Sequence, residues 1–181
     1  HVSQVLGEAI RGRKATVVGE RGCELQPLEL TEHGTWYDAP YSGGLGWGFG
    51  CALGIKLADR ERLVVATVGD GSYMFANPTV CHQVAEALEL PVVVLVINNG
   101  VWAAVRQSGG GLYPGGYAAK ANVMPLTSLQ PVPDFTMTAR ASRAHVERVE
   151  RAEDLRAAID RAIRAATEEK RQALVDIIVA D

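Results

Sequence analysis

The sequence predicts an α/β protein in three layers, α/β/α, around a mostly parallel central sheet. Two continuous apolar runs rich in β-branched residues, 63–68 and 92–97, are typical of strands that are buried on both faces. A helical pattern at residues 78–88 separates them, and parallel strands need such a crossover. Because the chain has 181 residues, we expect a single domain over residues 1–181.

The other elements continue the alternation of helix and strand. Further strands are expected at residues 15–18, 146–149 and 174–179, and further helices at 2–11, 43–58 and 152–167. The helix at 43–58 follows a glycine-rich start, and that at 152–167 is clearly amphipathic. Residues 107–133 break the pattern with four Pro and five Gly, so we expect either a functional flap or a disordered segment there.

Composition excludes several classes of protein. The net charge of -3 gives no basic excess for binding nucleic acid or an anionic membrane. The longest apolar runs are far shorter than the roughly 20 residues that span a bilayer, and no signal-peptide pattern is visible. We therefore expect a cytoplasmic protein. Cys23, Cys51 and Cys81 lack CxxC spacing, and their odd number argues against a disulfide framework.

Polar residues follow the two apolar strands directly. Gly69-Asp70-Gly71-Ser72 comes after residues 63–68, and Asn98-Asn99-Gly100 comes after residues 92–97. The carboxyl ends of parallel strands share one edge of a sheet, where such folds bind ligands, so both clusters are expected to lie together. Either cluster alone is a common turn. The pair, each placed after a buried strand, favours a binding site.

These residue types suit a metal ion and a phosphate group. Asp70 offers a carboxylate and Asn99 an amide oxygen, both hard ligands of the kind that Mg²⁺ prefers. Gly69 and Gly71 allow close approach of the backbone, whose N–H groups bind phosphate oxygens. Ser72 adds a hydroxyl donor, and the positive N-terminus of the next helix is expected to face the anion.

The spacing of the two clusters resembles the signature of thiamine diphosphate enzymes. The Gly-Asp-Gly motif is followed by the 26 residues from Ser72 to Ile97 and then by Asn-Asn. Residues 42–48 (Ser-Gly-Gly-Leu-Gly-Trp-Gly) and 51–54 are similar to the stretch that holds the aminopyrimidine ring in acetolactate synthases and benzoylformate decarboxylases. Residues 134–135, 153–155 and 174–176 are similar to the end of the same family's third domain.

The resemblance implies a thiamine diphosphate-binding fold, the cofactors thiamine diphosphate and Mg²⁺, and a role for each matching residue. Asp70 and Asn99 would bind Mg²⁺ by their side chains and Val101 by its carbonyl group. Gly43 would accept from the cofactor's 4′-amino group, and Leu45 would bend the cofactor into a V. The whole implied cofactor-binding set is Gly43, Gly44, Leu45, Gly69, Asp70, Gly71, Ser72, Asn99, Val101 and Trp102.

The resemblance also implies a carboligase or decarboxylase acting on a 2-keto acid, as part of a larger homodimer or homotetramer. No catalytic residue is expected in this chain, because the family's catalytic glutamate comes from the pyrimidine-binding domain of a partner subunit. We therefore expect a C-terminal piece of a longer protein, inactive by itself. Gly19-Glu20-Arg21 lies where relatives have polar residues that touch the diphosphate, but a glutamate there would repel phosphate, so we exclude it from the site.

Two alternatives stay open. The chain could be one subunit of a two-subunit 2-keto acid decarboxylase. It could also be a non-enzymatic phosphate- or nucleotide-binding module of flavodoxin-like shape. The segment around Gly43 and Leu45 favours the thiamine diphosphate interpretation, because a plain phosphate site needs neither residue.

Overall fold

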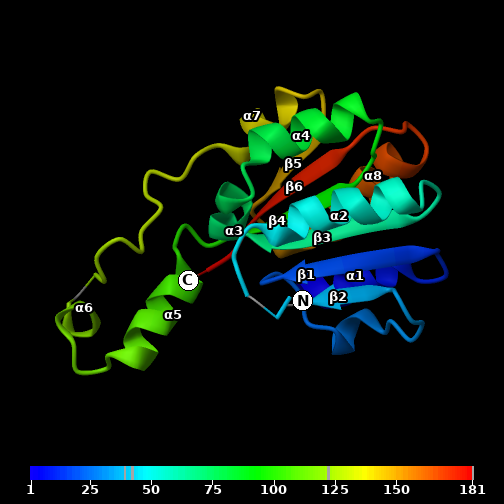
Figure 1. Cartoon of the computed structure of the whole chain (residues 1–181). Helices are drawn as coiled ribbons and strands as arrows, with labels where there is room; N and C mark the ends of the chain where they lie inside the picture. The colour runs from blue at the N-terminus through cyan, green and yellow to red at the C-terminus, as the bar shows by residue number, and fades with distance from the viewer. Residues whose placement is uncertain (39, 42, 122, 181) are drawn as a thin grey trace.

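The protein, described in a computed structural model at residues 1–38, 40–41, 43–121 and 123–180, is built on a six-stranded sheet with strand order β2-β1-β3-β4-β6-β5. Every neighbouring pair of strands is parallel (Figure 1). The strands are β1 Ala15–Glu20, β2 Trp36–Asp38, β3 Leu63–Gly69, β4 Val93–Asn98, β5 His145–Val149 and β6 Ala173–Ile178. The expected three-layer α/β class is therefore confirmed.

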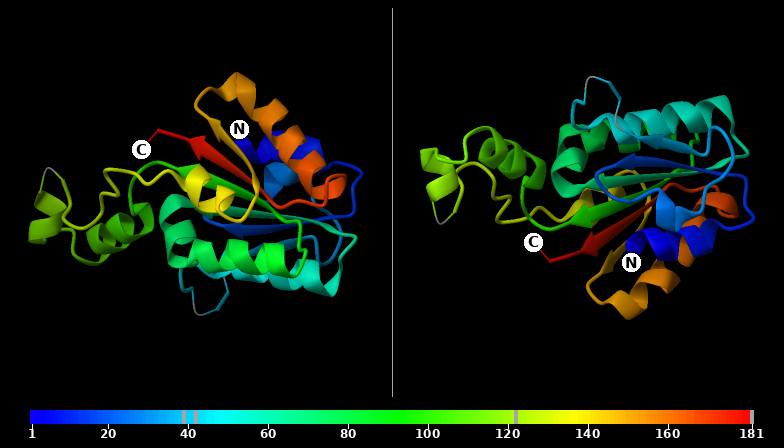
Figure 2. Two further views of the ribbon diagram at one scale, coloured as in Figure 1. Left: turned by 90° about the horizontal axis from the view of Figure 1, so that it is seen from above. Right: turned by 90° about the horizontal axis from the view of Figure 1, so that it is seen from below.

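Helices cover both faces of the sheet (Figure 2). On one face lie α1 Val2–Ile10 and α8 Leu155–Thr167, and on the other lie α2 Trp47–Ala58, α3 Asp70–Phe75, α4 Pro78–Ala87 and α7 Phe135–Arg140. Short 3₁₀ turns occupy Gln26–Leu28 and Ala152–Asp154. None of the helices in the described ranges is long and apolar enough to cross a membrane.

The two buried central strands supply side chains to both halves of the core. In β3, Leu63 and Val65 pack under α1 and α8, whereas Val64 and Ala66 pack under α2 and α4. All four residues are less than 5% exposed. Alternate side chains of a strand point to opposite faces of the sheet, so a strand covered on both faces has to be apolar throughout.

The sequence predicted five of the six strands and missed β2. This strand has only three residues and lies at the edge of the sheet, where it pairs with β1. Its Tyr37 and Asp38 are exposed. A short edge strand buries too little apolar surface to show a periodic hydrophobic pattern.

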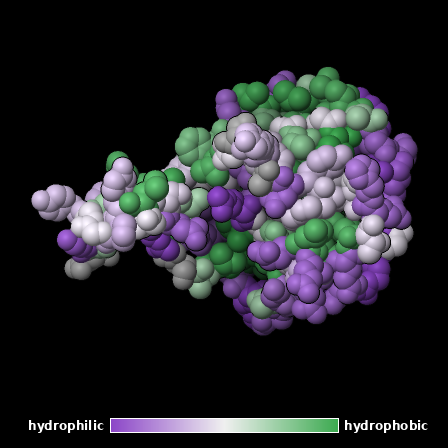
Figure 3. Space-filling model, turned by 60° about the horizontal axis from the view of Figure 1, so that its bottom comes forward, coloured by the Kyte–Doolittle hydropathy of each residue, from purple (hydrophilic) through white to green (hydrophobic). Residues whose placement is uncertain are grey.

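Residues 107–133 are more regular than expected. A helix, α5 Ala103–Leu112, begins before this segment and runs into it, and a second short helix, α6 Tyr117–Lys120, follows. Together they form an arm that extends from the body of the domain (Figures 1 and 3). α5 was not predicted because it contains three consecutive glycines at 109–111, and glycine is the least favourable helix residue after proline.

Buried hydrogen bonds connect three side chains on the face of the sheet that α2 and α4 cover. The Tyr73 hydroxyl lies 2.7 Å from Nε2 of His82, and Nδ1 of His82 lies 2.7 Å from Oε1 of Gln172. Oε1 is an acceptor only, so Nδ1 carries the proton and the Tyr73 hydroxyl donates to Nε2. Burial lowers the pKa of His82, which is fully buried.

Stability should fall as the pH drops below about 6.5 because of His82. The folded protein keeps this side chain neutral, whereas the unfolded chain binds a proton near its ordinary pKa of 6.5. The free energy of unfolding is therefore expected to fall by up to about 1.4 kcal/mol per pH unit in this window. Urea unfolding at pH 7.5 and 5.5 measures the slope.

His82→Gln should remove this part of the pH dependence, whereas His33→Gln, at an exposed turn position, should leave it unchanged. An unaltered slope in His82→Gln would show that other groups cause it.

Candidate functional site

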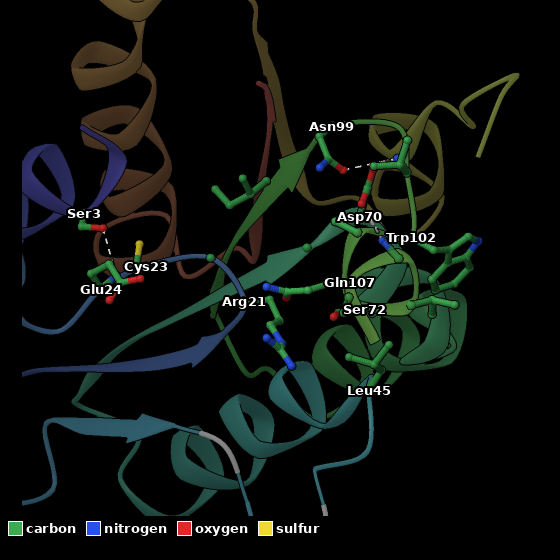
Figure 4. Close-up of a pocket in the computed structure, with 18 residues that line it drawn as sticks. Ser3, Arg21, Cys23, Glu24, Leu45, Asp70, Ser72, Asn99, Trp102 and Gln107 are labelled. Carbon is green, nitrogen blue, oxygen red and sulfur yellow. Dashed lines mark hydrogen bonds between the residues drawn. The ribbon is translucent and has the colours of Figure 1, made fainter. Parts of the chain in front are cut away.

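A cavity of about 390 Å³ opens at the carboxyl ends of the central strands (Figure 4). The turns after β1, β3 and β4 and the start of α5 form its walls. Its lining includes Leu45, Gly69, Asp70, Gly71, Ser72, Asn99, Val101 and Trp102, which are eight of the ten cofactor-binding residues expected from the sequence. The fold thus brings together segments that are up to 57 residues apart in the chain, Leu45 and Trp102 being the outermost.

Asp70 is the central acidic group of this cavity. Only 2% of the residue is exposed. Its Oδ1 accepts from the Gly71 amide at 2.8 Å, and its Oδ2 accepts from the Gly100 amide at 2.7 Å. Burial raises the pKa of Asp70, and these backbone donors act in the opposite direction. A buried carboxylate that depends on neutral donors is well suited to bind a cation.

A second buried acid, Asp176, supports the turn after β4 through Asn98. Asp176, on β6, accepts a 2.9 Å hydrogen bond from the Asn98 amide, and Oδ1 of Asn98 accepts from the Gly100 amide at 3.2 Å. The other oxygen of Asp176 has no hydrogen bond to the described residues and faces the guanidinium of Arg148 at 3.5 Å. Asn98 is therefore a structural residue, and its neighbour Asn99 is the one that lines the cavity.

Asn99 and Val101 complete the oxygen groups beside Asp70. The Asn99 side-chain oxygen accepts from the Val101 amide at 3.3 Å, which shapes the turn locally. Val101 forms an isolated antiparallel bridge with Ser128, so the segment that returns from the arm helps to fix this part of the backbone. Within the described ranges no cluster of three or more His, Cys, Asp or Glu occurs. The available donors are one carboxylate and neutral oxygens, a set that suits Mg²⁺ shared with a phosphate.

Trp102 lines the cavity and also packs the turn. A Cβ atom on Gly71 would lie 2.4 Å from the Trp102 ring, so glycine is required at this position. The same indole meets Phe75 edge-on at a centroid distance of 4.9 Å. The helix predicted at 78–88 is present as α4, but a short helix that was not predicted, α3, begins at Asp70 itself and is the one that follows the turn.

A second cavity of about 460 Å³ adjoins the first. Gly43 and Gly44, the other two expected cofactor residues, line this one, and Leu45 lines both. A Cβ atom on Gly43 or Gly44 would have no neighbour within 4 Å. Ser42, part of the motif that carried the resemblance, lies outside the described residues.

Glu20, excluded from the site by sequence reasoning, organises the second cavity. Its carboxylate accepts from the amides of Gly46 and Gly48, each at 2.5 Å, and the residue is 3% exposed. Gly46 has φ +92°, and a Cβ there would lie 2.7 Å from the Phe75 backbone. Gly46 and Gly48, which follow Leu45 in the chain, are thus held by Glu20, and this fixes the position of Leu45 between the cavities.

Fold and cavity define an α/β ligand-binding domain whose site lies at the carboxyl edge of a parallel sheet. A family model, "Thiamine pyrophosphate enzyme, C-terminal TPP binding domain", matches residues 22–177. The chain therefore belongs to the thiamine pyrophosphate enzyme family, as its C-terminal TPP binding domain.

Known proteins of this family are similar to parts of this chain. The acetolactate synthase large subunit IlvG of Mycobacterium tuberculosis is 36% identical over 133 residues, which are 71% of this chain and 22% of the relative. A benzoylformate decarboxylase of Pseudomonas aeruginosa is 33% identical over 85 residues, 47% of this chain and 16% of the relative.

A solved structure shares the fold. The thiamine diphosphate-dependent 4-hydroxybenzoylformate decarboxylase of Rhodococcus jostii RHA1 superimposes with a TM-score of 0.78 at 27% identity. The match covers 98% of this chain and 32% of that protein. The chain thus spans about a third or less of the length of these relatives.

Glu20→Gln should destabilise the domain by about 1–3 kcal/mol. The new amide nitrogen would face a backbone N–H that now has an acceptor, and an unsatisfied buried donor costs about this much. Urea unfolding measures the loss, and faster hydrogen exchange at Gly46 and Gly48 should accompany it. Glu32→Gln, at an exposed residue, is the control. Unchanged stability together with unchanged exchange would refute this role of Glu20.

Proposed function

We propose that this chain binds thiamine diphosphate with Mg²⁺ and forms one half of the active site of a 2-keto acid carboligase or decarboxylase. The observation that supports this best is the adjacent placement of Asp70, Asn99 and Val101 at one edge of the sheet, joined by the Gly100 hydrogen bond. In this proposal the three residues supply a carboxylate, an amide oxygen and a backbone carbonyl to the ion.

The chemistry of the donors fits this ion. Asp70 gives the one full negative charge among the three groups, and the remaining positions are left to phosphate oxygens and water, as is usual for Mg²⁺. Ser72 offers a hydroxyl donor in the lining of the same cavity, while the Gly71 amide donates to Asp70. Metal and diphosphate would therefore meet at the same turn.

The two adjoining cavities support an extended ligand. A diphosphate in the first cavity would leave the ring system near Leu45, which lines both, and the pyrimidine near Gly43 and Gly44 in the second. When bound, the thiazolium ring supplies the nucleophilic carbon and the electron sink. The residues of this chain bind and orient the cofactor, with Leu45 as the apolar support between its rings.

The activity of the whole protein needs a second domain in this proposal. The relatives are several times longer than this chain, and the resemblance assigns the catalytic glutamate to the pyrimidine-binding domain of a partner subunit. The arm also leaves large apolar side chains uncovered, which is typical of a surface that contacts another domain. They include Leu112, Tyr117 and Leu126, at 75%, 98% and 94% exposure.

Asp70→Asn should abolish Mg²⁺-dependent binding of thiamine diphosphate. The amide keeps the size of the side chain but removes its charge and one oxygen. The affinity is expected to fall by at least about 100-fold, since loss of a residue outside the ligand shell already costs about 10–100-fold. Isothermal titration with cofactor and Mg²⁺ measures it. Asp160→Asn, at an exposed helix position, should bind normally; equal affinity in both variants would remove Asp70 from the metal site.

The purified chain should not decarboxylate or ligate pyruvate, even with saturating thiamine diphosphate and Mg²⁺. It lacks the partner's acid, and proton transfer by such a group contributes about 10²–10⁴-fold in rate. The measurement is release of CO₂ and formation of acetolactate, with a thermal-shift control to show that the cofactor is bound. Turnover near the roughly 10 s⁻¹ of an ordinary enzyme would contradict the half-site model.

A further inference from the structure

The short helix α3 carries residues 70–72 of the candidate site on its first turn. The hydrogen bond from the Gly100 amide to Asp70 fixes the start of this helix. At its other end the side chains of Met74 and Phe75 are exposed. Between the two ends, α3 buries the large side chain of Tyr73. The direction of a helix of only six residues therefore depends on how Tyr73 is held.

Tyr73 is held by aromatic rings and by one hydrogen bond. Phe49 of α2 stacks on its ring at a centroid distance of 6.4 Å, and Phe135 of α7 meets it edge-on at 5.2 Å. The hydroxyl lies 2.7 Å from Nε2 of His82 on α4. Burial raises the pKa of Tyr73, so the hydroxyl keeps its proton and remains a donor. The rings fix the place of the phenol, and the hydrogen bond fixes its direction.

The acceptor for this hydroxyl is determined by Gln172, which lies directly before β6. Nε2 of Gln172 donates to the backbone carbonyl of His82 at 2.9 Å and to that of Ser142 at 3.2 Å. The amide cannot turn over without placing its own oxygen against these two carbonyls. Its Oε1 therefore faces Nδ1 of His82, which fixes the proton on Nδ1 and leaves Nε2 as an acceptor only.

A network of this kind contributes more to orientation than to stability. Buried hydrogen bonds add little net free energy of unfolding compared with apolar side chains of the same shape. A network in which every group has its partner permits one arrangement, however, and makes that part of the core rigid. Tyr73, His82 and Gln172 form such a network, and it ends on the helix that carries Asp70 and Ser72.

We propose that His82 and Gln172 are positioning residues for the cofactor site, which hold α3 through the Tyr73 hydroxyl so that Asp70 and Ser72 face the ligand. Neither His82 nor Gln172 is among the described residues that line the two cavities, so the effect of either on a bound cofactor is indirect. The inference rests on the proposed function and deepens it, because it extends the support of the site to the amino end of β6.

Two substitutions of His82 separate the two hydrogen bonds of its ring. Gln reaches the place of Nε2, and its Oε1 can accept from Tyr73. The shorter Asn reaches only the place of Nδ1, so it can donate to Gln172 but leaves the Tyr73 hydroxyl without an acceptor. Isothermal titration with Mg²⁺ and thiamine diphosphate should give nearly unchanged affinity for His82→Gln and about tenfold weaker binding for His82→Asn.

Tyr73→Phe tests the same link from the other side. It keeps the aromatic ring and removes the hydroxyl alone, so it should weaken binding about as much as His82→Asn does. Because it retains the packing of the core, it decides the question even where His82→Asn does not fold. All titrations are made at a temperature at which circular dichroism shows each variant to be folded, so that the affinity reports the site and not the folded fraction.

Ile159→Val is the control for a loss of stability alone. Ile159 is fully buried on α8, in the core on the opposite face of the sheet from Tyr73. Loss of a buried methylene group should lower the melting temperature. The folded molecules should nevertheless bind thiamine diphosphate as tightly as the unsubstituted chain does.

The outcomes separate this proposal from the proposed function. Normal affinity of Tyr73→Phe, with intact binding by the unsubstituted chain, would overturn the positioning role and leave the proposed function standing. Equal weakening in His82→Gln and His82→Asn, or in Ile159→Val, would also overturn it, because affinity would then not follow the acceptor for Tyr73. Absence of binding by the unsubstituted chain would overturn both proposals.

Discussion

The candidate site depends on one hydrogen bond, which the Gly100 amide donates to the buried carboxylate of Asp70. It joins the turn after β3 to the turn after β4. The parallel register, with Gly69 beside Ile97, brings the two turns within reach of each other. Because both strands are buried in a rigid sheet, the oxygen groups at their ends are held in place more accurately than a free loop could hold them. Asp176 adds to this rigidity from β6 through Asn98.

Most of the sheet could be predicted from the sequence because burial leaves a strong trace there. β3 and β4 have helices on both faces, and this requires the uninterrupted apolar runs from which they were recognised. β2 leaves no such trace, since it has three residues, of which Tyr37 and Asp38 are exposed and Trp36 alone packs against the core. α5 is hidden for the opposite reason: no residue of this helix is buried, so it has no apolar stripe, and its glycines argue against a helix.

Site residues could be predicted where the residue type suits the ligand and the residue directly follows a buried strand, as at Asp70 and Asn99. It was not predictable where the direction of a side chain decides the role. Glu20 and Arg21 are adjacent, and reasoning from charge alone rejected the segment that contains them. In the structure Glu20 binds the backbone of the Gly46 loop, while Arg21 lines the cavity. Sequence cannot show this, because the left-handed φ of Arg21 turns the chain after the strand ends.

The buried acidic groups near the candidate site suit ligand binding better than proton transfer. A general acid needs a carboxyl group with a raised pKa and access to the reacting ring. Burial raises the pKa of Asp70 and Asp176, but Asp70 accepts from two backbone amides in the first cavity, and Asp176 lines neither cavity. Glu20 reaches the second cavity with both oxygens already engaged. Glu24 and Asp38 also line the cavities, so the division of roles in the proposed function rests on the resemblance, which assigns the proton donor at the ring to a partner domain.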